Sequence, residues 1–267
     1  MTYLMETKNE AKRLLMKSDA DSTRAQLQLT GLKPRMSAVD AGGGAGFVSR
    51  IMAQIVGEEG CVSLVDQSSD RIQAAKDYIK PYSNVFYVQS DLRNIPIATG
   101  SVDYVFCRFV FEYLDEPTEV FDELYRIVKP GGRLIIGDLD NNILTHYPLG
   151  VELEQKLMQI VSEFERLKLW DPYMGRRLYS FYRQSSMREI TVHMLPHHLI
   201  YGEIKDADYQ NMKMKLDRVC ELWKSGSIQL NFDPEIFQRE FLEFFKSPDR
   251  FSYTPLILVE GVKALKV

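Results

Sequence analysis

Short apolar runs and amphipathic stretches follow one another in a regular order between about residues 37 and 139. The apolar runs have the length of strands and several end in a glycine or a carboxylate, whereas the stretches between them repeat apolar residues at helical spacing. Alternation of this kind indicates a parallel sheet with helices on both faces. The expected strands cover residues 36–40, 61–66, 84–88, 102–106 and 133–138.

The segments on both sides of this region are mostly helical. Residues 4–29 have a helical pattern, and we expect Asp21 or Ser22 to begin a second helix there as its N-cap. The chain therefore divides into an N-terminal helical segment that closes over the site (1–36), a ligand-binding core (37–140) and a helical cap with the last two strands (141–267). The expected cap helices cover residues 150–169, 176–185, 203–224 and 233–246, and the cap strands cover 189–194 and 255–260.

Composition and charge narrow the class of protein. Hydrophobic residues make up 45% and charged residues 26% of the chain, which is enough apolar material for a folded core. The formal net charge of -4 argues against a nucleic-acid partner. No run approaches the roughly 18 apolar residues of a membrane span, and the N-terminus lacks the apolar core of a signal peptide. The widely spaced Cys61, Cys107 and Cys220 are expected to be reduced thiols of a cytoplasmic protein.

A glycine cluster lies between the first expected strand and the helix after it. Glycines there remove side chains, so that a ligand can approach the backbone and the helix N-terminus. A dinucleotide fingerprint needs glycines at positions i, i+2 and i+5, but Phe47 and Ser49 occupy the positions where the third glycine would fall. The lysine of a P-loop is also missing. The pattern Asp-x-Gly-x-Gly-x-Gly from Asp40 to Gly46 remains, and it disfavours a nicotinamide dinucleotide or a nucleoside triphosphate.

Residues 39–46 resemble the first motif of class I S-adenosylmethionine-dependent methyltransferases, and further motifs follow in the order of that family. Asp66 matches the acid at the end of the second strand, and Asp91 matches the acid beside the adenine amine. Residues 101–105 and 128–134 match the fourth strand and the turn into the fifth. The resemblance covers about residues 37–139 and is closest to the branch that methylates small molecules, such as the ubiquinone- and menaquinone-pathway enzymes.

Two positions depart from that branch. Gly43 stands where its members usually have cysteine, and Tyr113 stands where many have histidine after the fourth strand. The smaller glycine should be tolerated. No catalytic role for a histidine can be carried over to Tyr113.

The resemblance implies a fold, a cofactor and a set of contacts. The implied fold is α/β, a doubly wound Rossmann-like sheet of seven strands, mostly parallel with the last strand antiparallel, plus the helical cap. The implied cofactor is S-adenosyl-L-methionine, with S-adenosyl-L-homocysteine as product. Asp66 would hold the ribose hydroxyls, Asp40 would either contact the cofactor or order the glycine loop, and Arg108 would pair with the cofactor carboxylate or form a surface salt bridge. The expected cofactor-binding residues are Asp40, Gly42, Gly44, Gly46, Asp66, Gln67, Asp91, Leu92 and Arg108.

The function that this predicts is transfer of a methyl group to a small acceptor by in-line displacement, a reaction that needs alignment and a dry pocket but no metal. The size of the cap suits a small apolar or aromatic acceptor. The alternative is a fold relative that binds S-adenosylmethionine or S-adenosylhomocysteine without methylating, either as a regulator or with a different sulfonium chemistry. A homodimer is possible under both interpretations.

The histidines and the aromatic residues of the cap leave alternatives open. His146 follows the fifth strand, and we weigh it as a general base against a loop residue without a catalytic role. His197 and His198 are adjacent and would point apart, so no metal site is expected. The phenylalanines between residues 232 and 245 either pack the cap helices together or line an apolar acceptor chamber.

Overall fold

The computed structural model describes residues 19–265, so the helix expected before residue 19 lies outside the described residues. Within them, one sheet has the strand order β3-β2-β1-β4-β5-β8-β6, and β7 pairs with β8. The strands are β1 (Ser37–Ala41), β2 (Cys61–Asp66), β3 (Val85–Gln89), β4 (Val102–Arg108), β5 (Val128–Leu139), β6 (His146–Tyr147), β7 (Met187–Tyr201) and β8 (Phe251–Lys263). The helices are α2 (Ala20–Leu29), α3 (Phe47–Val56), α4 (Ser69–Ile79), η1 (Phe111–Tyr113), α5 (Pro117–Ile127), α6 (Val151–Arg166), α7 (Met174–Gln184), α8 (Asp206–Lys224) and α9 (Pro234–Lys246).

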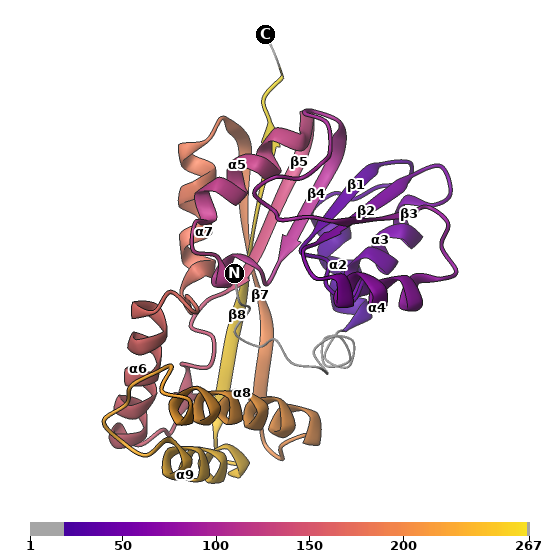
Figure 1. Cartoon of the computed structure of the whole chain (residues 1–267). Coiled ribbons are helices and arrows are strands. Elements are labelled where there is room, and N and C mark those ends of the chain that lie inside the picture. Colours follow the sequence, from indigo (N-terminus) through magenta and orange to yellow (C-terminus); the bar gives the residue numbers. More distant parts are fainter. Residues whose placement is uncertain (1–18, 266–267) are drawn as a thin grey trace.

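The predicted doubly wound α/β fold is confirmed. Strands β1 to β5 pair in parallel, and β8 runs antiparallel to β5. Helices α2, α3 and α4 lie on one side of the sheet, and α5 and α7 lie on the other (Figure 1). Seven strands of five or more residues correspond to the seven that were expected, and the two-residue β6 adds a short pairing with β8 that the sequence did not indicate.

The order in which successive strands are added to the sheet changes sides at β1: β2 and β3 are added on one side of it, and β4 and β5 on the other. Strand β1 pairs with β2 on one side and β4 on the other, so the loops after β1 and β4 leave the sheet at neighbouring points and then diverge. In open parallel sheets a crevice forms outside the carboxyl ends of the strands at such a switch point. The fold therefore places its crevice beside the glycine loop.

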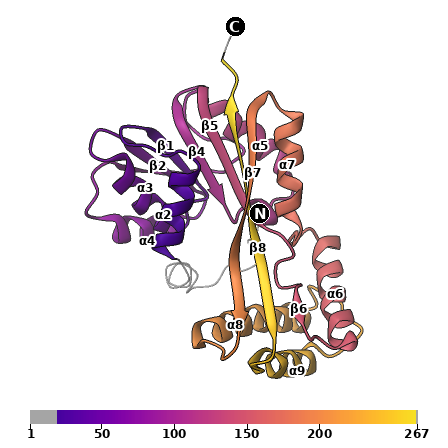
Figure 2. The ribbon, with the colours of Figure 1, turned by 180° about the vertical axis from the view of Figure 1, so that it is seen from behind.

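Strands β7 and β8 are longer than the sequence pattern predicts. They pair antiparallel from Met187 with Lys263 to Tyr201 with Phe251, and only the part of β8 from Leu256 onward also pairs with β5. The rest of the ribbon continues beyond the sheet into the cap (Figure 2). The sequence predicted this strand over residues 189–194, so it missed the part that contains Pro196. The strand tolerates this proline with a register shift between Pro196 and His198.

Side chains cap three of these helices. Ser68 caps α4 and Asp233 caps α9. The prediction for α2 was wrong, because Asp19 is the cap and its carboxylate accepts hydrogen bonds from the backbone N–H of Asp21 and Ser22. Asp21 and Ser22 therefore lie inside the first turn of that helix.

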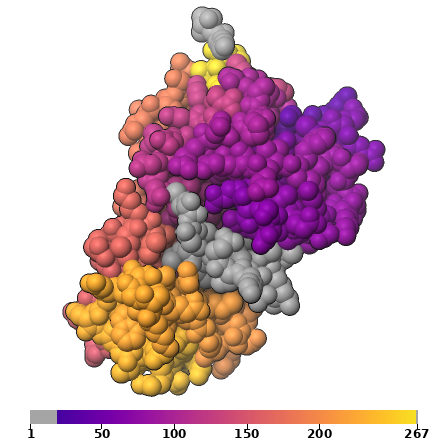
Figure 3. Space-filling view, in the orientation of Figure 1, coloured from indigo at the N-terminus to yellow at the C-terminus, as the bar shows by residue number. Residues whose placement is uncertain are grey.

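The cap has a hydrophobic core of its own. Helices α6, α8 and α9 form a lower lobe beneath the core (Figures 1 and 3). Phe237, Phe241 and Phe245 are fully buried there among the aliphatic residues of α6 and α8. These rings pack the helices against one another, so the packing interpretation of the aromatic cluster holds.

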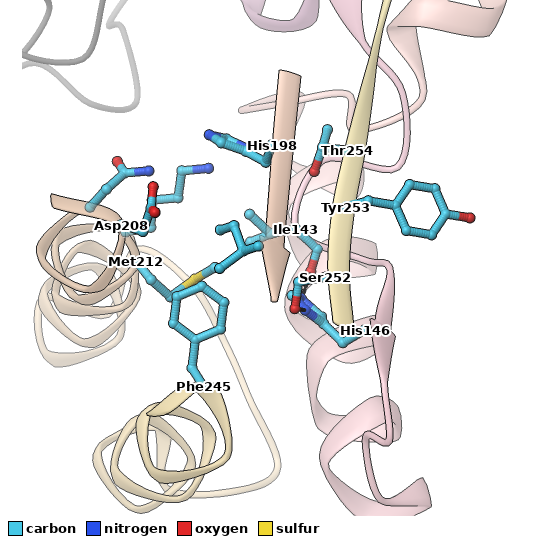
Figure 4. Close-up of a pocket in the computed structure, with 12 residues that line it drawn as sticks. Ile143, His146, His198, Asp208, Met212, Phe245, Ser252, Tyr253 and Thr254 are labelled. Atoms are coloured by element: carbon cyan, nitrogen blue, oxygen red, sulfur yellow. Dashed lines mark hydrogen bonds between the residues drawn. The ribbon is translucent and has the colours of Figure 1, made fainter. Parts of the chain in front are cut away.

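His146 belongs to this packed region. Its Nδ1 lies 2.7 Å from Ser252 Oγ and its Nε2 lies 2.8 Å from the carbonyl oxygen of Ile143. The ring meets Phe241 edge-on, and Figure 4 shows it beside Ser252. Burial lowers the pKa of His146 from 6.5 to about 4, because the interior disfavours the charged imidazolium.

We predict that His146 makes the protein sensitive to mild acid. Its folded-state pKa lies below its value in the unfolded chain, so the stability it contributes is present above about pH 6.5 and is lost as the pH falls toward 4. Between pH 7 and pH 5 this single group should lower the free energy of unfolding by about 2 kcal/mol. Urea unfolding at the two pH values should show that loss in the wild type and not in His146→Gln. Equal losses in both proteins would contradict the assignment.

Candidate functional site

A cleft of about 970 Å³ opens at the carboxyl ends of the parallel strands. Its walls come from α2, the glycine loop, the ends of β2 and β3, η1, the middle of β7 and the first half of α8. The cleft therefore lies between the core and the cap. Of the nine residues that the sequence assigned to a cofactor, all except Gly46 line it: Asp40, Gly42, Gly44, Asp66, Gln67, Asp91, Leu92 and Arg108.

The glycine loop owes its course to backbone conformations that favour glycine. Gly42 has φ +74°, and a Cβ built on it would lie 2.5 Å from Val110 Cγ2. The N–H groups of Gly42 and Gly43 both donate to the carbonyl oxygen of Val65, at 2.8 and 3.1 Å. A side chain at Gly42 would therefore push the loop away from the segment that follows β4.

Gly46 does not line the cleft but lies where two helices pack against each other. It is the N-cap of α3 with φ +87°, and a Cβ there would lie 2.5 Å from Ile79 Cδ1 and 3.0 Å from Ala75. Both neighbours belong to α4. The glycine thus allows α3 and α4 to approach each other.

The carboxylate of Asp66 joins the loops that follow β1 and β2. Oδ2 accepts a hydrogen bond from the N–H of Gly44 at 3.0 Å. Oδ1 accepts from the N–H of Ser68 at 2.9 Å and from Arg71 Nε at 3.1 Å. Because an ionised carboxylate can accept about four hydrogen bonds, one position remains for a ligand hydroxyl and a second would open if Arg71 moved.

Asp40 lies deeper in the same wall. Its Oδ2 accepts a hydrogen bond of 2.5 Å from Ser49 Oγ in the first turn of α3. Burial raises the pKa of Asp40 to about 6, against the opposing effects of the Ser49 hydrogen bond and the positive charge of Arg108. This contact favours the loop-ordering role among the two that the sequence left open.

Three further expected residues lie toward the β2 and β3 end of the cleft. The carboxylate of Asp91 forms a bidentate pair with Arg93, with distances of 3.0 and 2.6 Å, and this pair lowers the pKa of Asp91 to about 2. Gln67 is exposed, and Leu92 packs against the core below the cleft. The sequence did not predict Arg93, which also lines the cleft.

Arg108 ends β4 and reaches across to α2. Its Nη1 donates to Gln26 Oε1 at 2.6 Å and to Thr23 Oγ1 at 3.3 Å, and the guanidinium lies 4.9 Å from the centre of the Phe109 ring. Burial lowers its pKa to about 10. Within residues 19–265 it has no carboxylate within 4.0 Å, so the surface salt bridge considered above is not formed and the cation faces the cleft with neutral partners.

The opposite end of the cleft consists of residues that sequence reasoning did not assign. Glu112 follows β4, and its buried carboxylate accepts hydrogen bonds from Trp170 Nε1 at 2.8 Å and from Asn142 Nδ2 at 3.4 Å. Lys215 on α8 donates to Asn142 Oδ1 at 3.3 Å. Burial raises the pKa of Glu112 despite these donors. Its position after a strand end was the only available signal.

The histidines divide between the two regions. His197 and His198 line the cleft from β7, and the His197 ring lies 4.9 Å from Phe109. His146 does not line it, and both of its ring nitrogens are already bonded within the cap. A pKa of about 4 also lies far from that of an efficient base at neutral pH. In the part of the chain that the structure describes, no cluster of potential metal ligands is found.

Comparisons with known proteins agree with this geometry. Residues 39–136 match a family model described as a methyltransferase domain. The ubiquinone/menaquinone biosynthesis C-methyltransferase of Vibrio parahaemolyticus is 23% identical over 193 residues, which are 71% of this chain and 70% of that protein. The enzyme of the same name from Legionella pneumophila is 28% identical over 116 residues, which are 42% of this chain. They are 46% of that relative, so the chain spans about half of its length.

A solved structure extends the likeness to the cap. Phosphoethanolamine N-methyltransferase 2 of Haemonchus contortus, in complex with phosphomonomethylethanolamine and S-adenosylhomocysteine, has a TM-score of 0.57 at 17% identity. The match covers 91% of this chain and 52% of that one. The family model and the relatives favour a methyltransferase over a fold relative that binds the cofactor without methylating. Residues 39–136 of the chain thus carry a methyltransferase domain, and the fold is that of a solved methyltransferase.

Proposed function

We propose that this protein transfers the methyl group of S-adenosylmethionine to a small-molecule acceptor by in-line displacement and releases S-adenosylhomocysteine. One observation carries the proposal: a single cleft joins a wall of strand-end carboxylates and glycines to a second wall contributed by the cap. Two reactants bound side by side in such a cleft need mainly alignment and exclusion of water. No step requires a covalent enzyme intermediate.

The cofactor wall supplies a partner for each part of the cofactor. Asp66 accepts from the ribose hydroxyls, and Asp91 with Leu92 lies at the adenine. Gly42 and Gly44 leave room for the ligand backbone, and Arg108 binds the carboxylate of the methionine part. The hydrogen bonds of Arg108 to α2 support this role, because they fix the guanidinium without neutralising it.

The N-terminal segment forms part of this site in our proposal. In α2, which precedes the core, Ser22, Thr23 and Gln26 line the cleft. We therefore keep 1–36 as a segment that closes over the cofactor, 37–140 as the cofactor-binding core and 141–267 as the cap that completes the acceptor side. Residues 1–18 lie outside the described residues.

The acceptor has an apolar or aromatic body in this proposal. Apolar side chains line the cleft, among them Phe109, Val110, Leu114, Leu139 and Met214. Apolar walls with a few polar groups are typical of small-molecule sites, and the volume lies at the upper end of their usual range of about 300–1,000 Å³. Room for a cofactor and a small acceptor together fits that volume.

We also infer a cytoplasmic enzyme that forms a homodimer and does not act on nucleic acid. Cys61, Cys107 and Cys220 are free thiols. Exposed apolar side chains on β7, such as Met194 and Tyr201, offer a surface for a second copy. The net charge of -4 disfavours nucleic acid. In the described part of the chain no helix has the length and hydropathy of a membrane span.

The proposed activity is tested with a screen of phenols, quinols and amines in which release of S-adenosylhomocysteine is the readout. We expect turnover with at least one class. Tight binding of S-adenosylhomocysteine without turnover of any acceptor would argue for a cofactor-binding protein that does not methylate.

We predict that Asp66→Ala weakens binding of S-adenosylhomocysteine by roughly 10- to 150-fold, because a hydrogen bond to a charged group is worth about 1.5–3 kcal/mol. Calorimetry measures the affinity. Asp70→Ala is the matched control, since Asp70 is an exposed acid in the first turn of α4 and does not line the cleft. Equal affinities of the Asp66 variant and the wild type would remove Asp66 from the ribose site.

A second substitution distinguishes the contribution of the amino-acid end of the cofactor to binding from that of the nucleoside. Arg108→Met should weaken S-adenosylhomocysteine by about tenfold or more, because the carboxylate loses its cationic partner. The same variant should bind 5′-methylthioadenosine, which lacks that carboxylate, as tightly as the wild type does. Asp66→Ala should weaken both ligands. If Arg108→Met weakened both equally, its effect would come from the structure of the cleft and not from a charge pair.

A further inference from the structure

The first half of α8 turns one polar face toward the cleft. Asp208, Asn211 and Lys215 lie at the i, i+3 and i+7 positions, so they follow one side of the helix. All three line the cleft, and all three also line a small cavity of about 20 Å³ that adjoins it. Figure 4 shows Asp208 and His198 at one end of that cavity and His146 at the other.

Asn211 is the residue on this face that has an unsatisfied hydrogen-bond acceptor. Its side chain is 7% exposed, and its Oδ1 is a buried oxygen without a hydrogen-bond partner within residues 19–265. Leaving such a group buried and unpaired costs about 1–3 kcal/mol. A hydrogen-bond donor supplied by a bound molecule would remove this cost.

The charges around Asn211 indicate which donor fits. Asp208, one turn earlier on α8, is half-buried and has no cation within 4.0 Å among the described residues. Lys215, one turn after Asn211 on α8, donates to Asn142 Oδ1, and Asn142 in turn donates to Glu112. The positive charge of Lys215 is thus offset by Glu112, whereas Asp208 has only the more distant attraction of Arg250.

We propose, building on the methyltransferase function above, that the face formed by Asp208 and Asn211 binds a protonated amino group of the acceptor. An ammonium group offers up to three donors and a positive charge, which match an unpaired amide oxygen and an unpaired carboxylate one helical turn apart. A hydroxyl would satisfy Asn211 but leave Asp208 without a close counter-charge. A carboxylate would be repelled. The acceptor is therefore an amphipathic amine, with its apolar body against Phe109 and Met214.

The proposal is tested with three probes that share one aromatic body: 2-phenylethylamine, 2-phenylethanol and 3-phenylpropionate. Each is titrated by ligand-observed NMR into the full chain saturated with S-adenosylhomocysteine at pH 7, where the amine is protonated as a lysine side chain is. We expect the amine to bind at least tenfold more tightly than the carboxylate. A carboxylate or an alcohol that binds as tightly as the amine would overturn the proposal.

Substitutions place the effect on α8. Asn211→Leu and Asp208→Asn should each weaken the amine about tenfold or more, whereas Asn211→Asp should tighten it severalfold because it adds a charge without changing the shape. Asp217→Asn is the matched control, since it removes the same charge from the same helix outside the cleft. If an internal water in the small cavity already satisfies Asn211, both Asn211 variants would leave the affinity for the amine unchanged, and the proposal would fall.

Separate measurements distinguish this inference from the function on which it rests. The affinity for S-adenosylhomocysteine is determined in the wild type and in every variant, and Asn211→Asp serves where Asn211→Leu lowers the thermal midpoint. Cofactor binding without a preference for the amine would overturn only the acceptor assignment. A wild type that did not bind S-adenosylhomocysteine would overturn the proposed function, and the three probes would then be ranked on the free protein to decide the amine site by itself.

Discussion

The antiparallel pairing of β7 with β8 determines where the two walls of the cleft lie. The carboxyl-terminal part of β8 is hydrogen-bonded to β5 in the core, and its first residues pair only with β7 and β6 in the cap. One ribbon thus belongs to both lobes. Backbone hydrogen bonds along such a ribbon resist bending more than a flexible linker does, so α8 and the loops after β4 and β5 are held at a fixed separation. Methyl transfer between two bound molecules needs such a fixed separation, because small errors in alignment raise the activation barrier of the displacement.

The cofactor wall is organised by carboxylates that already have partners. Asp66 accepts from Gly44, Ser68 and Arg71, and Asp91 is paired with Arg93. Binding of a nucleoside would therefore exchange or share partners around these acids. The free energy gained at each acid is then the difference between two sets of hydrogen bonds, which is smaller than the value of either set. Arg108 differs, since its neutral partners leave its charge for the ligand.

Much of the core could be predicted because each feature there has a local cause in the sequence. The strand runs that end in Asp40 and in Asp66, and the glycines that follow Asp40, are each recognised from a few neighbouring residues. The carboxyl ends of the strands of a parallel sheet then lie at one edge. The wall on α8 has no such local cause. Asp208, Asn211 and Lys215 have the spacing of an ordinary solvated helix face, and only the tertiary position of α8 turns that face toward the cleft. Likewise His146 follows β5 as a base might, but its surroundings in the cap decide that it is packed and neutral.

Buried polar groups lie at both ends of the cleft and differ in how far they are paired. At the core end, the carboxylate of Asp40 accepts a hydrogen bond from Ser49, which together with the charge of Arg108 offsets part of the effect of burial on its pKa. At the cap end, the buried oxygen of Asn211 has no hydrogen-bond partner among residues 19–265, which is a cost to the folded protein in the absence of ligand. A ligand that supplies the missing hydrogen bond removes this cost, and the removal adds to the binding free energy. In our proposal the cap end of the cleft therefore selects the acceptor, whereas the core end lies within residues 39–136, which match the methyltransferase domain.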